Sequence, residues 1–323
     1  MSRPSSFARI LAVSVLTFAV GMAAEAQSER AQSLRQIVGR AHNQSGSEQA
    51  KPAGIGSNPF MLIDYPGGLG NQYPSAINDK GKIVGVTGLP DGSFQGYLLQ
   101  GSTFRLISYP NAPNTAAFGI NKSGVIVGTY CEDAGCNIGH GFMLKGKNFT
   151  TLDYPGGTNA EALAINASGD VVGTYESPDS HLHCFLLHKG VYTTFDYPNA
   201  YQTVARSINQ QGMIVGGYIN PDGTGAGFTL LNGTFTEIDY PGVLNSEIDS
   251  INDSGDMVGT FQNPGEDGAH GYLLSGGVFT SFDVPFPGST ATAPDGMNNK
   301  HQIVGSYGTF SPDDYFFGFL TTY

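Results

Sequence analysis

One arginine and four carboxylates lie at regularly spaced positions and could act as a group. Arg206 precedes Asp249 by 43 residues and Asp249 precedes Asp295 by 46, while Glu161 and Glu247, two positions earlier in their units, are 86 residues or two units apart. Repeating units of this length would bring such positions together around a common axis. An acidic funnel with a single guanidinium could bind a sugar, a cation or a basic peptide group, or its carboxylates could serve a hydrolase or lyase. The plainer alternative is that a water-filled channel tolerates polar residues.

Two aromatic residues extend this candidate site, because Phe118 occupies the position equivalent to Arg206 and Tyr73 the position equivalent to Glu247. Tyr73 and Phe118 could stack on a sugar ring, as could Tyr201, because the chain contains no Trp. The predicted ligand-binding residues are Tyr73, Phe118, Glu161, Arg206, Glu247, Asp249 and Asp295. The sequence has no G-x-S-x-G elbow, H-E-x-x-H pair or phosphate loop, so we assign no catalytic residue. The pattern favours a binding protein over an enzyme.

Metal binding has weaker support in the sequence. His181 and His183 alternate along a predicted strand, so both face one side and could share a metal ion. Two ligands fall short of a complete set. The acidic loops PGEDG and NPDGTG leave room for a structural Ca²⁺, although they lack the ligand spacing of a calcium loop. We therefore predict no metal site and no cofactor.

Four short sequence boxes recur in step, every 43 to 47 residues. The Asp-Tyr-Pro box begins at Asp64, Ser108, Asp153, Asp196, Asp239 and, as Asp-Val-Pro, Asp283. The Ile/Met-Asn box has its Asn at Asn78, Asn121, Asn166, Asn209, Asn252 and Asn298. The Val-Gly box ends at Gly85, Gly128, Gly173, Gly216, Gly259 and Gly305. A small residue precedes an aromatic one at Tyr97, Phe142, Phe185, Phe228, Tyr272 and Phe319. This regularity indicates a repeat fold.

Each repeat contains four short strand patterns, which is typical of a β-propeller blade. In the third unit they are EALAIN, DVVGTY, LHCFLLHK and VYTTFDY. The chain ends after the third strand of its last unit, whereas residues 60–65 form a fourth strand without predecessors. Pairing these pieces would close the ring and remove two exposed sheet edges. We predict an all-β, six-bladed propeller of four-stranded blades; RQIVGR at Arg35–Arg40 leaves open a decayed seventh unit.

Comparison of the six copies distinguishes residues that serve folding from residues that could serve a function. A residue present in every unit serves folding, so the Asp-Tyr-Pro box is interpreted as structural. Its Tyr packs on a neighbouring blade, its Pro ends the strand, and its Asp accepts hydrogen bonds from the following turn or a neighbouring blade. The six repeated Asn residues are interpreted as turn formers. The long, variable connections share one face of a propeller, so we expect binding on that face.

The repeats resemble a known family. The blocks FTTLDYPGG…AINASGDVVGTY and GHGFML are similar to the HAF repeats of bacterial extracellular proteins, whose His-Ala/Gly-Phe box has counterparts at His140-Gly141-Phe142 and His270-Gly271-Tyr272. The other units depart from this box and have Gln95, His183-Cys184, Ala226 and Phe317 at that place. The resemblance covers Phe60 to Tyr323 and implies a secreted, propeller-like fold. It implies no established activity and lends no catalytic residues.

The N-terminus has the pattern of a secretory signal peptide. Arg3 and Arg9 precede an apolar run that ends in the small residues AEA. We predict a signal peptide over residues 1–26, a flexible leader over 27–59 that is rich in Gln, Ser, Gly and Pro, and a propeller domain over 60–323. An uncleaved anchor helix is the competing interpretation, although the apolar run is short for a membrane span.

Charge and cysteine content fit the same compartment. The formal net charge is −12 with only 15 Lys and Arg residues, which argues against a nucleic-acid partner. Cys131 and Cys136 flank EDAG, and an oxidising compartment would let them pair. Cys184 is left over and is most simply a buried small hydrophobe.

The sequence therefore predicts a monomeric binding or scaffold module, secreted or periplasmic, with no membrane span in its mature chain. Its variable loop face would engage extracellular carbohydrate or protein. Two alternatives stay open. One is an extracellular hydrolase or lyase that uses the channel-mouth carboxylates, and the other is a purely structural surface or matrix protein.

Overall fold

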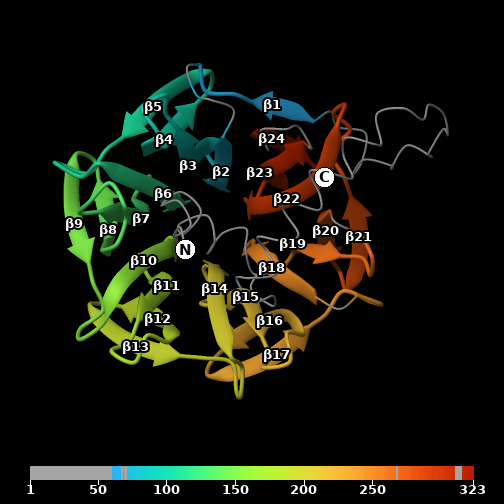
Figure 1. Cartoon of the computed structure of the whole chain (residues 1–323). Coiled ribbons are helices and arrows are strands. Elements are labelled where there is room, and N and C mark those ends of the chain that lie inside the picture. Colours follow the sequence, from blue (N-terminus) through green and yellow to red (C-terminus); the bar gives the residue numbers. More distant parts are fainter. Residues whose placement is uncertain (1–59, 67, 69–70, 244, 267, 310–314) are drawn as a thin grey trace, which may run out of the picture.

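The computed structural model describes residues 60–323 except 67, 69–70, 244, 267 and 310–314. The predicted signal peptide (1–26), the leader (27–59) and the segment Arg35–Arg40 lie outside the described residues. The described part is built from β-strands, and its short sheets form a ring around a central axis (Figure 1). Within these residues, no helix has the length and apolar character needed to cross a bilayer.

The strands follow one another in groups of four, each group running from the axis to the rim (Figure 1). The innermost strands are β2 (Gln72–Ile77), β6 (Asn114–Ile120), β10 (Thr158–Ile165), β14 (Gln202–Ile208), β18 (Asn245–Ile251) and β22 (Ser289–Met297). The second strands are β3 (Lys82–Gly88), β7 (Ile126–Cys131), β11 (Val171–Glu176), β15 (Ile214–Ile219), β19 (Met257–Gln262) and β23 (Gln302–Thr309). The third strands are β4 (Phe94–Gln100), β8 (Gly139–Lys145), β12 (Leu182–His188), β16 (Gly225–Leu231), β20 (His270–Ser275) and β24 (Tyr315–Thr322). The outermost strands are β5 (Thr103–Ile107), β9 (Asn148–Leu152), β13 (Val191–Phe195), β17 (Thr234–Ile238), β21 (Val278–Phe282) and β1 (Met61–Ile63).

Hydrogen bonding divides the ring into blades. Four separate sheets have four strands each, and the remaining eight strands form one sheet. That larger sheet is held together between its halves by a single parallel bridge, from Gly225 of β16 to Asn245 of β18. Each half is otherwise antiparallel, from β14 to β17 and from β18 to β21. Counted as four-stranded antiparallel units, the described residues form six blades.

The ring closes through the two ends of the described chain, as the sequence predicts. β1 pairs antiparallel with β24, and Leu62 lies opposite Phe319 in the register. The final sheet therefore has the order β1-β24-β23-β22, with its outermost strand supplied from the N-terminal side. The strand is shorter than the predicted 60–65 and covers Met61–Ile63. Phe60, just before it, packs against Phe319 with ring centroids 5.7 Å apart.

The Val-Gly box lets the inner strand approach the second strand closely. A Cβ at Gly128 would overlap the carbonyl oxygen of Ala116 and come within 2.9 Å of the Phe142 ring. The same clash with the inner strand recurs at Gly173 and Gly259. Every inner strand also carries a register shift, such as the one between Ala117 and Gly119. Glycine is therefore required where the irregular inner strand leans on its neighbour.

The tyrosine of the Asp-Tyr-Pro box joins neighbouring blades, which confirms the prediction for that residue. Tyr109 follows β5 and stacks on Tyr130 of β7, in the next blade, with ring centroids 3.6 Å apart. The same arrangement recurs in the pairs Tyr154–Tyr175, Tyr197–Tyr218 and Tyr240–Phe261. Such aromatic pairs add about 0.5–1.5 kcal/mol beyond the area that they bury.

The aspartate of the box behaves differently from the prediction in three blades. His140 Nδ1 lies 2.9 Å from Asp153 Oδ2, and this pair joins the third and fourth strands of a single blade. His183 with Asp196 and His270 with Asp283 repeat the pairing. The sequence did not predict this His–Asp pairing, because the histidine belongs to the His-Ala/Gly-Phe box and not to the Asp-Tyr-Pro box. Where Ser108 replaces the aspartate, Gln95 replaces the histidine, and the hydroxyl donates to the amide oxygen at 2.7 Å.

In two blades the aspartate accepts from the neighbouring blade, as predicted. Ser246 Oγ donates to Asp239 Oδ1 at 2.9 Å, and Gln72 Nε2 donates to Asp64 Oδ1 at 2.6 Å. The box is therefore structural in every blade in which its contacts are described, although its partner changes.

Candidate functional site

The structure brings the non-repeating positions of the inner strands together at the axis. One residue from each inner strand lines a cavity of about 50 Å³: Ser75, Phe118, Leu163, Arg206, Asp249 and Asp295. We call this the charged cavity. Four of the predicted ligand-binding residues belong to this lining, and Glu247 reaches it through Arg206.

A buried ion pair forms the centre of the charged cavity. Arg206 Nη2 lies 3.1 Å from Glu247 Oε2, and Arg206 Nε lies 3.8 Å from Asp249 Oδ1. All three side chains are less than one tenth exposed. Thr260 Oγ1 lies 3.4 Å from Glu247 Oε1 and 3.3 Å from Asp249 Oδ2, so its single hydroxyl hydrogen can be donated to either carboxylate. The guanidinium is therefore committed to protein carboxylates.

The remaining carboxyl groups are poorly compensated. Burial raises the pKa of Asp295 to about 8, because Arg206 offsets it only in part. Burial likewise raises the pKa of Glu161 to about 8, and its Oε2 atom is buried without a hydrogen-bond partner in the described residues. Burial and the charge of Glu247 raise the pKa of Asp249 well above its ordinary value. At neutral pH these shifts favour the protonated forms of Asp295 and Glu161, whereas Arg206 stays paired with Glu247.

The predicted aromatic residues are buried and belong to the packing around the cavity. Phe118 and Tyr73 are each 7 % exposed, and Phe118 packs with Leu163 and Val204 in a hydrophobic cluster. Tyr73 contacts Phe316 with ring centroids 5.3 Å apart. Neither ring is available to stack on a sugar. A cavity of about 50 Å³ is also far below the roughly 300–1,000 Å³ of typical small-molecule sites.

The loop face carries an exposed aromatic side chain in a fixed position. Tyr201 precedes β14, and its backbone N–H donates to the carbonyl of Ile219 at 2.7 Å. Its side chain is 62 % exposed, the largest exposure of an aromatic residue in the described part of the chain. Equivalent positions in other repeats have Pro113, Thr158 and Thr290.

The variable loops of this face are internally braced. Cys131 and Cys136 form the disulfide that the sequence suggested. His140 ties the same loop to the blade, because its Nε2 lies 3.1 Å from Glu132 Oε1 while Nδ1 contacts Asp153. Ile138, in this loop, is 47 % exposed. Cys184 is buried and is the one free cysteine among the described residues.

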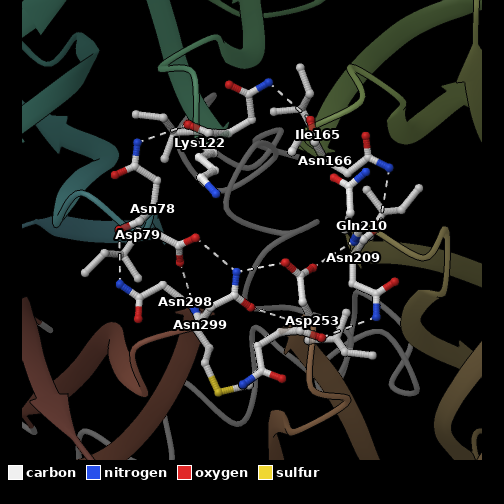
Figure 2. Close-up of a pocket in the computed structure, with 18 residues that line it drawn as sticks. Asn78, Asp79, Lys122, Ile165, Asn166, Asn209, Gln210, Asp253, Asn298 and Asn299 are labelled. Atoms are coloured by element: carbon white, nitrogen blue, oxygen red, sulfur yellow. Dashed lines mark hydrogen bonds between the residues drawn. The ribbon is translucent and has the colours of Figure 1, made fainter.

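A second axial cavity, which the sequence analysis missed, opens at the other end of the channel (Figure 2). It measures about 100 Å³ and lies where the inner strands turn into the second strands. We call it the turn-face pocket. The residue after each repeated Asn lines it: Asp79, Lys122, Ala167, Gln210, Asp253 and Asn299. These residues differ between units except for the two aspartates, and that variation beside a fixed Asn was the signal that could have identified the pocket.

The repeated asparagines form the wall of the turn-face pocket. Each Asn Oδ1 accepts backbone N–H bonds within its own turn, as Asn78 does from Lys80 and Lys82. This confirms the predicted turn role. The amide also links blades, since Asn78 Nδ2 donates to the carbonyl of Asn121 at 3.0 Å. The same link continues from Asn121, Asn166, Asn209 and Asn298.

The two histidines considered for a metal have separate partners. His181 Nδ1 lies 3.2 Å from Asp179, whereas His183 Nδ1 lies 2.7 Å from Asp196. In the part of the chain that the structure describes, no group of three or more His, Cys, Asp or Glu residues is arranged to hold a metal ion.

The closed ring of antiparallel blades around a narrow axial channel places this chain among the β-propellers. No protein-family model matches the sequence, and no curated protein is detectably similar to it. Solved structures do match the fold.

TolB from Acinetobacter baumannii aligns with a TM-score of 0.54 and 12 % identity, over 75 % of this chain and 63 % of TolB. AofleA from Arthrobotrys oligospora aligns with a TM-score of 0.53 and 12 % identity, over 82 % and 87 % of the two chains. A fungal lectin from Aleuria aurantia, described as a six-bladed β-propeller with a novel fucose recognition mode, aligns with a TM-score of 0.50 and 13 % identity, over 79 % and 93 %. The chain thus spans less than two thirds of TolB. At these identities the likeness concerns the fold alone.

Proposed function

We propose that this protein is an extracytoplasmic binding module that engages carbohydrate or protein through its loop face. The observation that carries the proposal is Tyr201, a non-repeating aromatic ring that is 62 % exposed on a backbone anchored to β15. An exposed aromatic face on a rigid support is suited to stacking against a sugar ring or anchoring a protein contact. The braced loop that carries Ile138 supplies a second exposed apolar side chain.

The similar folds support carbohydrate as one partner class. The Aleuria aurantia lectin, a six-bladed β-propeller with a fucose recognition mode, is a case in which this architecture serves sugar binding. The predicted signal peptide and the HAF resemblance support a secreted or periplasmic, monomeric chain, and the Cys131–Cys136 disulfide fits an oxidising compartment.

A hydrolase or lyase at the charged cavity has less support. Its carboxylates are buried around Arg206, and a cavity of about 50 Å³ leaves no room for a sugar beside them. A purely structural role is the outcome if no ligand is found.

The test compares two exposed residues in different places. Wild type, Tyr201→Ala and Val278→Ala would be screened on a glycan array and in pull-downs from the native cell exterior. Val278 is 64 % exposed at the start of β21, after a short turn, and serves as the matched control. We expect saturable binding that falls at least about tenfold with Tyr201→Ala and is unchanged with Val278→Ala. Equal binding by both variants would refute the role of Tyr201, and silence in all assays would refute the proposal.

A further inference from the structure

We propose that the turn-face pocket is a binding site for a small zwitterion, of the class of free amino acids, which carries an ammonium and a carboxylate a few ångströms apart. This inference concerns the end of the channel away from Tyr201 and is independent of the proposed loop-face function. The proposal rests on the positions of the charged side chains that line the pocket.

One side of the turn-face pocket is acidic and oriented. Asn299 Nδ2 donates to Asp79 Oδ2 at 3.0 Å and to Asp253 Oδ2 at 2.9 Å, so one amide holds both carboxylates (Figure 2). Backbone N–H groups fix the other oxygens, from Asn299 to Asp79 and from Gln210 to Asp253. An ionised carboxylate has about four acceptor positions, so both groups retain capacity to accept from a ligand.

The side-chain links between the six repeated asparagines form a ring of hydrogen bonds, which we call the asparagine ring. This ring is interrupted on the same side of the pocket, between Asn252 and Asn298. Asn252 Nδ2 donates to Asp256 Oδ2 at 3.2 Å and contacts Tyr323, whereas the other five amides reach the next Asn carbonyl. Among the described residues, the carbonyl of Asn298 therefore receives its turn bond from His301 but no side-chain donor from the preceding blade. Two carboxylates and one carbonyl make an acceptor-rich side, which matches the three N–H donors of an ammonium group.

The positive charge of the pocket faces Asp253. Lys122 extends toward the centre from the turn between β6 and β7, across the pocket from Asp253 and one blade along from Asp79 (Figure 2). None of the ion pairs formed by the described residues includes Lys122. Opposite charges thus share one small pocket without pairing, and a ligand carboxylate would complete the contact to Lys122.

Size and apolar lining narrow the ligand class. The pocket measures about 100 Å³, and a single water needs about 10–15 Å³ on the same scale. This volume suits a small amino acid and excludes a peptide segment or a disaccharide. The Ile77, Ile120, Ile165, Ile208, Ile251 and Met297 side chains also line the pocket. They would contact a short aliphatic side chain.

The experiment separates the two charges of the ligand. The full chain would be titrated with L-alanine, with ethylamine as the ammonium alone, and with propionate as the carboxylate alone. Calorimetry would measure affinity, and NMR would follow the side-chain amides of the repeated asparagines. We expect saturable L-alanine binding that perturbs these amides, and binding of each half at least about tenfold weaker, as expected for one lost charge-assisted bond.

Variants place the binding in the pocket. Lys122→Gln and Asp253→Asn should each weaken L-alanine about tenfold, while Lys80→Gln, an exposed lysine outside the lining, should leave it unchanged. Absence of saturable L-alanine binding would overturn the proposal. So would ethylamine binding as tightly as L-alanine, or equal effects of Lys122→Gln and Lys80→Gln.

Discussion

The two ends of the axial channel are built from nearly adjacent residues of the same six strands, yet they hold charge in opposite ways. In the charged cavity, Arg206 is buried and fully engaged by Glu247 and Asp249. In the turn-face pocket, Lys122 is exposed, lies across from Asp253 and next to the blade of Asp79, and forms an ion pair with neither. The comparison shows that a constellation of charged residues is not a binding site when its members satisfy one another in a closed space.

Burial is the physical origin of the difference. A buried charge is retained only when partners compensate its lost hydration, so the charged cavity has to pair or protonate its groups. At the turn-face pocket Lys122 and Asp253 are exposed, so their charges can stay hydrated without partners. Substitutions in the charged cavity are therefore expected to change stability, and substitutions in the turn-face pocket to change ligand binding. The following substitutions test this difference.

The largest effect should come from removing the buried cation. Arg206→Met leaves Glu247 and Asp249 facing each other without a counter-charge, and we expect it to cost about 3–5 kcal/mol of unfolding free energy near pH 8. The cost should shrink as the pH falls, because burial and the charge of Glu247 raise the pKa of Asp249 and favour its protonation. Lys122→Met, at the other end, should change stability by no more than about 0.5 kcal/mol. Denaturant titrations of both variants measure this contrast, and similar losses would remove the distinction between the ends.

The second prediction concerns the pH dependence of the free energy of unfolding. The pKa of Asp295 is about 8 in the folded chain and near 3.9 when unfolded, so the folded state binds its proton more tightly. Its contribution to stability is therefore complete below pH 4 and is lost as the pH rises toward 8. Asp295→Asn cannot ionise, so it should be more stable than wild type at pH 8–9, by about 1–4 kcal/mol. Thermal unfolding between pH 5 and pH 9 tests this. A parallel pH dependence in the two proteins would contradict it.

A smaller effect is expected from the asparagine ring. Asn121→Ala removes the Nδ2 link to Asn166 and two turn bonds to backbone N–H groups, so we expect a loss of about 1–2 kcal/mol. Ser123→Ala, whose exposed hydroxyl lies in the same turn, is the control and should be close to neutral. If Asn121→Ala changed the free energy of unfolding as little as Ser123→Ala, the links between the asparagines would not stabilise the fold.

Much of the architecture follows from sequence because the repeat compares the chain with itself. The closure through β1 and β24, the stacking of Tyr109 on the next blade, and the gathering of Arg206 with Asp249 and Asp295 all come from counting positions. Periodicity fixes which residues share a layer. It does not indicate whether the side chains of that layer are exposed to solvent. Tyr73 and Phe118 were therefore predicted to stack on a sugar ring, although both are buried.

What the sequence could not supply are relations between different boxes. The pairing of His140 with Asp153 joins two motifs that seemed independent, and the joint replacement by Gln95 and Ser108 is recognisable only once their contact is known. The turn-face pocket was overlooked for a similar reason. The turn role of Asn121 accounts for the repeated Asn, and only the folded ring shows that the variable residue after it, Lys122, lines a pocket.

The claim that one end of the channel is closed around its charges can be tested directly at Asp295. An NMR titration that follows the side-chain carboxyl carbon of Asp295 measures its ionisation in the folded protein. A midpoint near pH 8 is predicted, because burial raises the pKa and Arg206 is already engaged. A midpoint below about pH 5, close to that of an ordinary aspartate, would show a wet and charged cavity and would contradict the account.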